Sequence, residues 1–277
     1  MRSADVHALF EKLERLRIVL SREAVARMRS SPRLADPRRL EHFGFRAYSQ
    51  NDEDGIIAEI FTRIGTTGRQ FLEIGAGEGL ENNTAYLLVQ GWTGAWIEGG
   101  KKEGQRITRS FAAPLKSGQL RLANAFVSRE NVNDLVTSLG LTGDIDFLSI
   151  DIDGNDYHVF EALSAVRPRV VALEYNATFR PPVHFVSPYD AQRRWDGTIA
   201  YGASLVALTE LAERRGYTLV GCNLTGVNAF FVRTDLTTDR FCGPPSAQNF
   251  YHEPAYELTD AFRSGHPAAH AAGVRAE

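Results

Sequence analysis

Residues 71–79 constrain the fold of this chain more than any other stretch. An apolar run that contains Glu73 meets three glycines, Gly75, Gly77 and Gly79, and a pattern of helical period follows over residues 80–89. This order predicts a strand, a tight turn and a helix, because glycines at such a junction adopt positive φ and let a ligand approach the backbone. The first turn of the helix would add unpaired N–H groups. We therefore expect a nucleotide-like ligand at this turn.

The spacing of the glycines separates two classes of nucleotide-binding turn. The dinucleotide fingerprint needs a third glycine five residues after the first, and Leu80 occupies that position. An NAD-dependent oxidoreductase is therefore disfavoured. The next predicted strand, residues 94–98, ends in Glu98, whose carboxylate can accept hydrogen bonds from both hydroxyls of a ribose. Glu98 is the second expected contact to the ligand.

Length and composition favour one soluble α/β domain with extensions. The chain has 277 residues, of which 43% are hydrophobic and 23% charged, and no low-complexity linker divides it. We expect an N-terminal helical extension over 1–47, a core domain over 48–233 and a C-terminal extension over 234–277. A formal net charge of −3 argues against a nucleic-acid partner. Two cysteines, no signal-like segment and no apolar run of membrane-spanning length predict a cytoplasmic protein without a membrane partner.

The order of predicted elements indicates a doubly wound, mostly parallel seven-stranded sheet of the Rossmann-like α/β class. We expect further strands over 120–127, 146–151, 169–176, 217–223 and 228–233, and helices over 106–115, 131–139, 157–166 and 204–214. The last two strands are joined by a short connection, so they form an antiparallel hairpin that standard dinucleotide-binding folds lack. Residues 177–201 break this rhythm with prolines and aromatic residues, and we expect them to form a substrate lid.

Two helices are expected before the sheet. Apolar residues recur three and four apart over residues 6–28, which predicts an amphipathic helix. Such a helix packs either on the domain or on a second subunit, so a homodimer is one of two alternatives. The second helix has Ser49 or Asn51 as its cap and begins with an acidic first turn.

Four polar side chains follow the fourth and fifth strands, at the edge where open parallel sheets bind ligands. Asp151 and Asp153 are two residues apart, and Glu174 and Asn176 repeat that spacing one strand over. If the strands persist, each pair shares a face, and neighbouring strands lie roughly 4.8 Å apart. Carboxylates this close repel one another unless a cation lies among them, and oxygen ligands suit Mg²⁺ or Mn²⁺.

Other polar residues near this edge have alternative roles. Asn155 and Asp156 fit a turn with a helix cap as well as a ligand site. His158, one turn into the next helix, and His184, in the lid, are alternative general bases for a hydroxyl substrate. Asp153 is expected to contribute to catalysis beside them.

Four segments together resemble a known enzyme family: residues 71–79, Glu98, residues 148–157 and residues 171–176. They are similar to the FkbM-like branch of class I S-adenosylmethionine (SAM)-dependent methyltransferases, over about residues 48–233. Within that branch the chain most resembles bacterial sugar O-methyltransferases, including the 1-O-methyltransferases of methylmannose polysaccharide biosynthesis. The resemblance implies a SAM site made of Glu73, Gly75, Gly77, Gly79, Glu98, Asn124, Ala125, Asp151 and Gln50. In it, Gln50 would meet the methionine end of SAM, and Asn124 and Ala125 the adenine.

The resemblance also indicates which residues would bind a metal ion. Related metal-dependent sugar and catechol methyltransferases place an aspartate after strand four and an Asp-Asp or Asp-Asn pair after strand five. Asp151 or Asp153 matches the first position. Glu174 and Asn176 match the second only loosely, because Tyr175 separates them.

The leading interpretation is an enzyme that moves a methyl group from SAM to a hydroxyl of a sugar, an oligosaccharide or a glycosylated small molecule. A methyltransferase for a non-sugar natural product and a non-catalytic SAM-binding scaffold are the alternatives. A nucleic-acid base methyltransferase is disfavoured, because its Asn-Pro-Pro-aromatic signature after strand four is replaced by Asp151-Ile-Asp-Gly.

Overall fold

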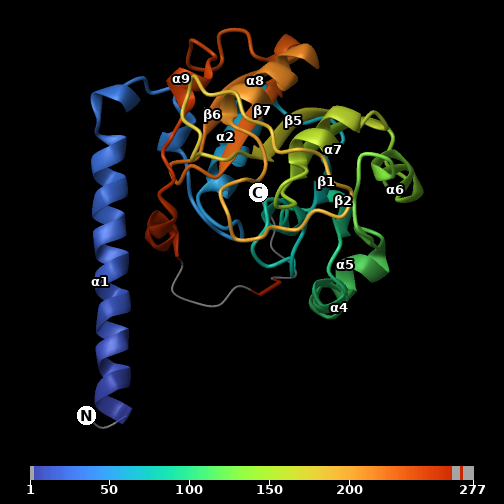
Figure 1. Cartoon of the computed structure of the whole chain (residues 1–277). Helices are drawn as coiled ribbons and strands as arrows, with labels where there is room; N and C mark the ends of the chain where they lie inside the picture. Colours follow the sequence, from blue (N-terminus) through green and yellow to red (C-terminus); the bar gives the residue numbers. More distant parts are fainter. Residues whose placement is uncertain (1–2, 264–268, 271–277) are drawn as a thin grey trace.

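A seven-stranded mixed sheet forms the centre of the molecule (Figure 1). The computed structural model describes residues 3–263 and 269–270. The strand order is β3-β2-β1-β4-β5-β7-β6, with β1 to β5 parallel and β7 antiparallel to both of its neighbours. The strands are β1 (Gln70–Ile74), β2 (Thr93–Glu98), β3 (Leu120–Asn124), β4 (Gly143–Ile150), β5 (Val166–Glu174), β6 (Tyr217–Cys222) and β7 (Asn228–Arg233). The predicted doubly wound sheet with a C-terminal hairpin is confirmed.

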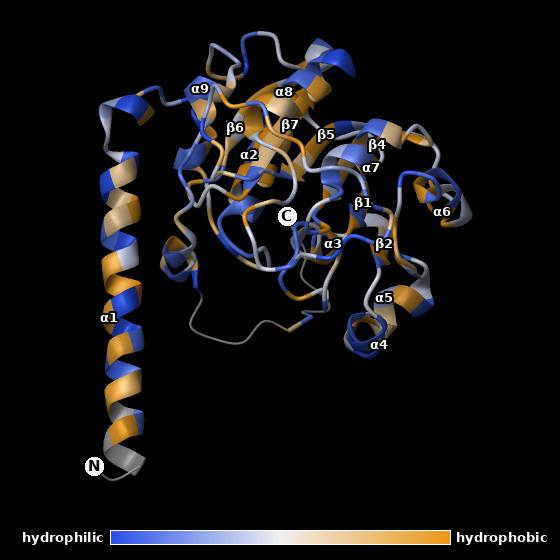
Figure 2. Ribbon diagram, in the orientation of Figure 1, coloured by the Kyte–Doolittle hydropathy of each residue, from blue (hydrophilic) through white to orange (hydrophobic). Residues whose placement is uncertain are grey.

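Helices cover both faces of this sheet. In β1, Phe71 packs in one apolar cluster and Leu72 in the other, because successive side chains of a strand point to opposite faces. The Leu72 face is covered by α6 (Val132–Ser138), α7 (Asp156–Ala162) and α8 (Leu205–Arg214). The Phe71 face is covered by α2 (Glu53–Ile64), α3 (Ala85–Val89), α4 (Lys101–Ser110) and α5 (Ala112–Ser117). Figure 2 shows the apolar strands between helices of mixed polarity.

Several predicted element ends are wrong. The helix expected over 106–115 is two helices, α4 and α5, separated at Phe111, whose ring is fully buried against Trp96. The third strand stops at Asn124 instead of residue 127. The helix expected to reach Val166 ends at Ala162, and Val166 already pairs with Gly143 as the first residue of β5.

The C-terminal extension packs on the core. Its described part, residues 234–263 and 269–270, contains three short helices, η3 (Thr234–Leu236), α9 (Ala247–Phe250) and η4 (Tyr256–Phe262). Phe250 and Tyr251 belong to the apolar cluster on the Leu72 face. Cys222 and Cys242 are both buried and free.

Helix α1 (Ser3–Arg29) stands beside the domain (Figure 1). Near its C-terminal end, Val25 and Met28 pack with Leu34 and Leu258, and the helix runs against η4. Two short helices, η1 (Pro32–Leu34) and η2 (Leu40–His42), lead from α1 to α2. Within residues 3–263 and 269–270, none of the helices combines the length and apolarity needed to cross a lipid bilayer.

Candidate functional site

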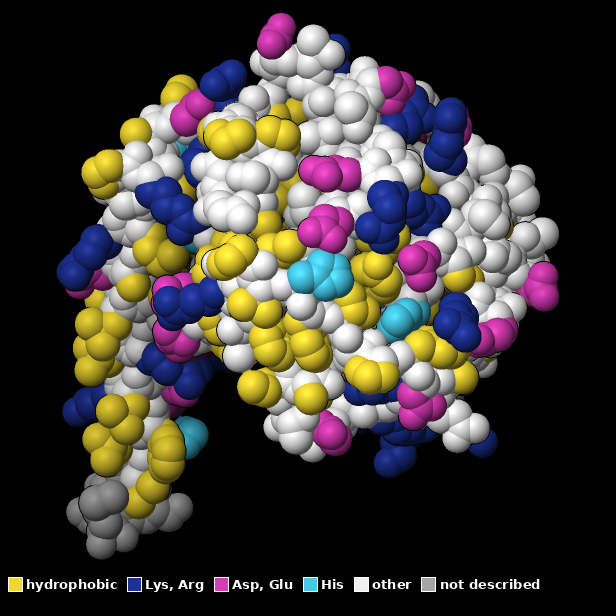
Figure 3. Space-filling model, turned by 45° about the horizontal axis from the view of Figure 1, so that its top comes forward, with side chains coloured by type: hydrophobic (Ala, Val, Ile, Leu, Met, Phe, Trp, Pro, Cys, Tyr) yellow, Lys and Arg dark blue, Asp and Glu magenta, His cyan; other side chains and the backbone are white. Residues whose placement is uncertain are grey.

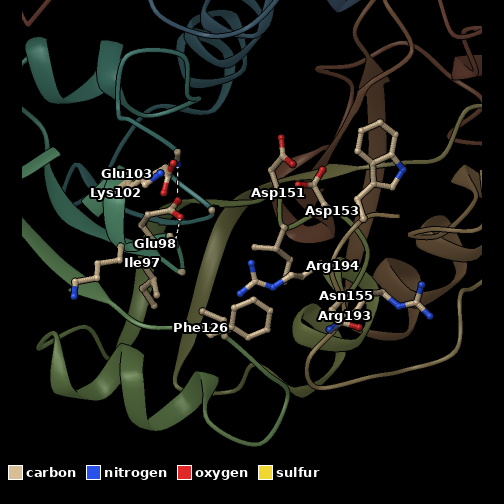
Figure 4. Close-up of a pocket in the computed structure, with 18 of the residues that line it drawn as sticks. Ile97, Glu98, Lys102, Glu103, Phe126, Asp151, Asp153, Asn155, Arg193 and Arg194 are labelled. Atoms are coloured by element: carbon tan, nitrogen blue, oxygen red, sulfur yellow. Dashed lines mark hydrogen bonds between the residues drawn. The ribbon is translucent and has the colours of Figure 1, made fainter. Parts of the chain in front are cut away.

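A cavity of about 970 Å³ opens at the carboxyl edge of the sheet (Figure 4). The loops after β1, β2, β3 and β4 form its walls, and part of the segment 177–201 covers it. The strand order reverses between β1 and β4, and open α/β sheets bind ligands at such a switch point. Residues that line the cavity include Gln50, Gly75, Gly77, Glu98, Lys101, Lys102, Phe126, Asp151, Asp153, Asn155, Arg193, Arg194 and Trp195.

The loop after β1 depends on its glycines. Gly75 has a φ of 89°, and a Cβ there would overlap the carbonyl oxygen of Asp151. Gly77 has a φ of 57°, and a Cβ there would meet no atom within 4 Å, because this position opens into the cavity. Gly79 does not line the cavity, and a Cβ there would collide with Trp96. Gly77 is thus the glycine that leaves room for a ligand against the backbone.

Glu98 ends β2 and faces the cavity (Figure 4). Its Oε2 accepts a hydrogen bond from the N–H of Gly77 at 2.7 Å, and its Oε1 accepts one from the N–H of Gly100 at 2.6 Å. Burial raises the pKa of Glu98, and the two N–H groups oppose that rise. A carboxylate has about four acceptor positions, so Glu98 keeps capacity for hydroxyl groups of a ligand.

The carboxylate of Glu73 lies under the glycine loop and not in the cavity. It is buried and accepts hydrogen bonds from the N–H groups of Asn83 at 2.8 Å and Thr84 at 3.2 Å. Helix α3 begins at Ala85 and not at Leu80, and these bonds satisfy N–H groups just ahead of it. The expectation that Glu73 and a free first helical turn meet the ligand is corrected, because this acid supports the loop from beneath.

The loop after β3 places different residues at the cavity from those expected. The Nδ2 of Asn124 donates to the carbonyl oxygens of Glu98 at 2.7 Å and Gly100 at 2.9 Å, which ties β3 to the loop after β2. Neither Asn124 nor Ala125 lines the cavity, whereas Phe126 does. The strand ends at Asn124, and the chain reaches the cavity only after it has turned.

Three carboxylates meet at the ends of β4 and β5. Oxygen atoms of Asp151, Asp156 and Glu174 lie within 4.8 Å of one another. Asp156 also accepts hydrogen bonds from the N–H groups of Ile152 and Gly154, both at 3.0 Å. We call these three residues the acidic triad. Asp151 turns its carboxylate toward the cavity across from Glu98 (Figure 4).

The acidic triad differs from the predicted metal set in two positions. Strand β4 ends at Ile150 and Asp153 has a φ of 55°, so the alternation that would align Asp153 with Asp151 is broken. Asp153 lines the cavity outside the triad. The Nδ2 of Asn176 donates to the carbonyl oxygens of Ile199 at 2.8 Å and Tyr201 at 2.9 Å, so Asn176 holds the covering segment.

Ionising all three carboxyl groups of the acidic triad is unfavourable without a cation among them. Burial, followed by the charges of the neighbouring acids, raises the pKa of Asp151 and of Glu174 well above their ordinary range. Burial also raises the pKa of Asp156 to about 6. A cation among these oxygens would compensate the repulsion, and an all-carboxylate set suits a hard divalent ion.

The covering segment is held against the loop after β4. The Nδ2 of Asn155 donates to the carbonyl oxygen of Asp190 at 2.8 Å, and the hydroxyl of Ser187 donates to the carbonyl oxygen of Gly154 at 3.1 Å. The Oδ1 of Asn155 is buried without a hydrogen-bond partner. Arg194 lies over the ring of Phe126, 5.8 Å from its centre.

The structure does not bring the two predicted histidines to the cavity. The Nε2 of His158 lies 2.9 Å from the carbonyl oxygen of Ser187, so this ring braces the covering segment against α7. His184 is exposed, 3.3 Å from Glu210. Gln50, by contrast, does line the cavity, as its expected contact with the ligand requires.

Comparisons with known proteins find only distant likenesses. No family model matches the sequence, and no curated protein is similar to it. Magnesium protoporphyrin IX methyltransferase from Synechocystis PCC 6803 with bound SAH is 13% identical, with 66% of this chain and 82% of that chain covered and a TM-score of 0.43. A SAM-dependent methyltransferase from Clostridium acetobutylicum ATCC 824 is 11% identical, covering 76% and 98%, with a TM-score of 0.42. The N-terminal domain of EvdMO1 with SAH bound is 16% identical, covering 65% and 79%, with a TM-score of 0.39. Likenesses this weak carry no conclusion about activity.

Several cavity residues were missed by sequence reasoning. Asp156, which does not itself line the cavity, was interpreted as either a helix cap or a ligand residue and was left out of the predicted metal set; it both caps the loop and completes the acidic triad. Phe126 lay within the third predicted strand, residues 120–127, and reaches the cavity because the strand ends at Asn124. Arg194 and Trp195 had no signal beyond their place in the long proline-rich segment.

Proposed function

We propose that this chain is a SAM-dependent O-methyltransferase that methylates a hydroxyl of a sugar, an oligosaccharide or a glycosylated small molecule. The observation that carries the proposal is the pairing of two groups across one cavity. On one side is Glu98, fixed by Gly77 and Gly100; on the other is Asp151, the member of the acidic triad that lines the cavity. The first suits a ribose diol, and the second suits a hydroxyl that must lose its proton.

The residues present fit SAM as a cofactor. Gly77 leaves open space in front of the backbone, and Glu98 retains acceptor positions toward the cavity. Ligand pockets range from about 300 to 1,000 Å³, so a cavity of about 970 Å³ is large enough for a cofactor and an acceptor together. SAM supplies a methyl group on an already activated sulfonium, so the protein mainly positions the acceptor and removes its proton.

The acidic triad fits the second task. A divalent cation held by Asp151, Asp156 and Glu174 would lower the pKa of an acceptor hydroxyl and orient it. The same carboxyl groups have raised pKa values, so one of them can hold a proton near neutral pH. Asp153 lies beside the triad at the cavity wall, where it can bind an acceptor hydroxyl.

The rim of the cavity supports a sugar as acceptor. Phe126 is 42% exposed and Trp195 57% exposed, although both are large apolar side chains. Aromatic faces at the edge of a polar cavity pack against the C–H face of a sugar ring. The unpartnered Oδ1 of Asn155 can accept a hydrogen bond from a sugar hydroxyl.

Calorimetry with SAM, followed by a methyl-transfer assay over sugars, glycosides and non-sugar phenols, tests the proposal. We expect SAM binding and turnover with at least one sugar-containing acceptor. Turnover confined to non-sugar acceptors would overturn the substrate class. Binding without any turnover would favour a non-catalytic SAM-binding scaffold, and retention of NAD by the purified protein would favour an oxidoreductase.

A further inference from the structure

Helix α1 carries a regular apolar stripe that its own domain does not cover. Val6, Leu9, Leu13, Leu16 and Leu20 follow one another at alternating spacings of three and four. This is the a and d pattern of a coiled coil, over two heptads. The four leucines are 48–55% exposed. Figure 3 shows yellow side chains along the projecting helix.

A different face of α1 makes the contacts within the chain. The hydroxyl of Ser21 donates to the carbonyl oxygen of Glu257, and Val25 packs in the cluster with Leu258. Arg17 pairs with Asp260. Residues 9–20 nevertheless contain six of the thirteen exposed large apolar side chains found in residues 3–263 and 269–270. So dense an apolar surface on a soluble helix indicates a partner.

We propose that the stripe of residues 6–20 pairs with the same stripe of a second copy of this chain, as an antiparallel two-helix interface. The period favours a helix as occupant, since an a and d seam is complementary to another such seam. Covering the four leucines of the stripe, together with Phe10 and Val19 that flank it, buries roughly 600 Å² on each helix at about 100 Å² per side chain. Both helices together then reach the lower end of the standard size for specific interfaces.

The charges beside the stripe and the position of the domains favour an antiparallel orientation of the two α1 helices. In a parallel pair, Lys12 at position g would face Arg17 at position e of the partner helix, and like charges at these positions oppose pairing. An antiparallel pair avoids this contact. It also places the two domains at opposite ends of the helix pair, because each domain packs near the C-terminal end of its own α1 (Figure 1).

A membrane surface is the rival occupant and is less well supported. Helices that lie on membranes carry a polar face rich in lysine and arginine. The polar face of α1 instead mixes signs, with Glu11 and Glu14 among its arginines. This mixture suits a helix in water beside another helix.

The oligomeric state tests the proposal. Light scattering coupled to gel filtration should give twice the chain mass of 30.7 kDa for the full chain at micromolar concentration. The double variant Leu13→Glu with Leu16→Glu should give the monomer mass with unchanged circular dichroism. Arg15→Glu, an exposed position off the stripe, is the charge-matched control and should stay dimeric. A monomeric full chain, or a dimeric double variant, would overturn the interface.

Cysteine cross-linking tests the orientation, since both natural cysteines are buried. In the antiparallel pair Leu9 lies opposite Leu20 of the second copy. A mixture of the Leu9→Cys and Leu20→Cys chains, oxidised with diamide, should therefore form a disulfide-linked dimer that neither chain forms alone. Cross-linking of Leu9→Cys with itself would overturn the antiparallel arrangement. Co-sedimentation of a monomeric full chain with phosphatidylserine vesicles would show that the stripe binds a membrane and not a second copy of the chain.

Discussion

At the scale of single residues, the candidate site depends on backbone N–H groups that donate hydrogen bonds to buried carboxylates. Glu73 takes the donors of Asn83 and Thr84 beneath the loop, and Glu98 takes those of Gly77 and Gly100 at the cavity. The loop is thereby held in one conformation before any ligand arrives. A ligand that meets such a preorganised loop does not have to order it.

Glu98→Ala should weaken SAM binding by about 1–3 kcal/mol, because hydrogen bonds to a partly buried carboxylate are lost. Calorimetry measures the change. Glu161→Ala, on the exposed surface of α7, is the control and should leave the affinity unchanged. Equal affinities for Glu98→Ala and the unmodified chain would mean that Glu98 does not hold the ribose.

Gly77→Val should abolish detectable SAM binding, since a branched side chain would occupy the open space and resist a φ of 57°. Gly118→Val is the matched control. Gly118 has a φ of 77° and open surroundings, but it ends α5 away from the cavity. The control should lower thermal stability and still bind SAM; loss of binding in both variants would point to general misfolding.

Glu174→Gln should lower turnover by at least ~10²-fold, because it removes one charge from the acidic triad. Asp153→Asn should have a smaller effect, since Asp153 lies outside the triad. Rates at saturating SAM, with EDTA and then with added Mg²⁺ or Mn²⁺, make the comparison. Full activity after exhaustive chelation would eliminate the cation and leave a carboxyl group of the triad as the base.

At the scale of elements, the covering segment 177–201 has no helix and one isolated bridge, so its position depends on side-chain anchors. Asn176 holds its end through two carbonyl oxygens, and Asn155 and His158 hold its middle. Residues that the sequence analysis assigned to ligand binding or to base catalysis therefore hold this segment in place.

Asn176→Ala should raise the KM for the acceptor about tenfold with little change in SAM affinity, because losing hydrogen bonds to two partly buried carbonyls costs about 1–3 kcal/mol. Faster proteolysis within 177–201 should accompany the change. Gln192→Ala, exposed in the same segment, is the control. Unaltered KM and proteolysis would show that the segment does not depend on this anchor.

At the scale of the whole molecule, buried acids couple stability to pH. Burial raises the pKa of Asp156 to about 6 and of Glu73 to about 7, from ordinary values of 3.8 and 4.5. A carboxyl group with a higher pKa in the folded state stabilises the fold below its unfolded pKa. It loses that contribution as pH rises through the folded pKa.

The Tm of the cation-free protein should therefore fall as pH rises from about 5 to about 8. Mg²⁺ or Mn²⁺ should raise the Tm more at the upper pH, where the acidic triad is ionised. Differential scanning calorimetry at both pH values measures this. In the Glu174→Gln variant, the fall in Tm with rising pH and the increase in Tm on adding the cation should both be smaller. A Tm that rises with pH, or a cation effect equal at both values, would contradict the account.

The sequence alone determined the sheet, its hairpin and the two carboxylate positions Glu98 and Asp151. Apolar runs, glycine turns and the order of elements are local signals, and parallel strands bring their ends to one edge whatever the details. For the same reason Gly77 was found at the cavity, whereas Gln50 was expected there from the family resemblance alone.

Only the tertiary structure decided which polar groups meet there. Strand β4 ends one residue before Asp151, so strand alternation could not place Asp153, and Asp156 takes its place from the start of α7. Glu73 and Asn176 were assigned to ligands, yet each satisfies nearby backbone groups. A polar side chain bonds whichever unpaired backbone group folding brings within reach, and that depends on contacts far apart in the sequence.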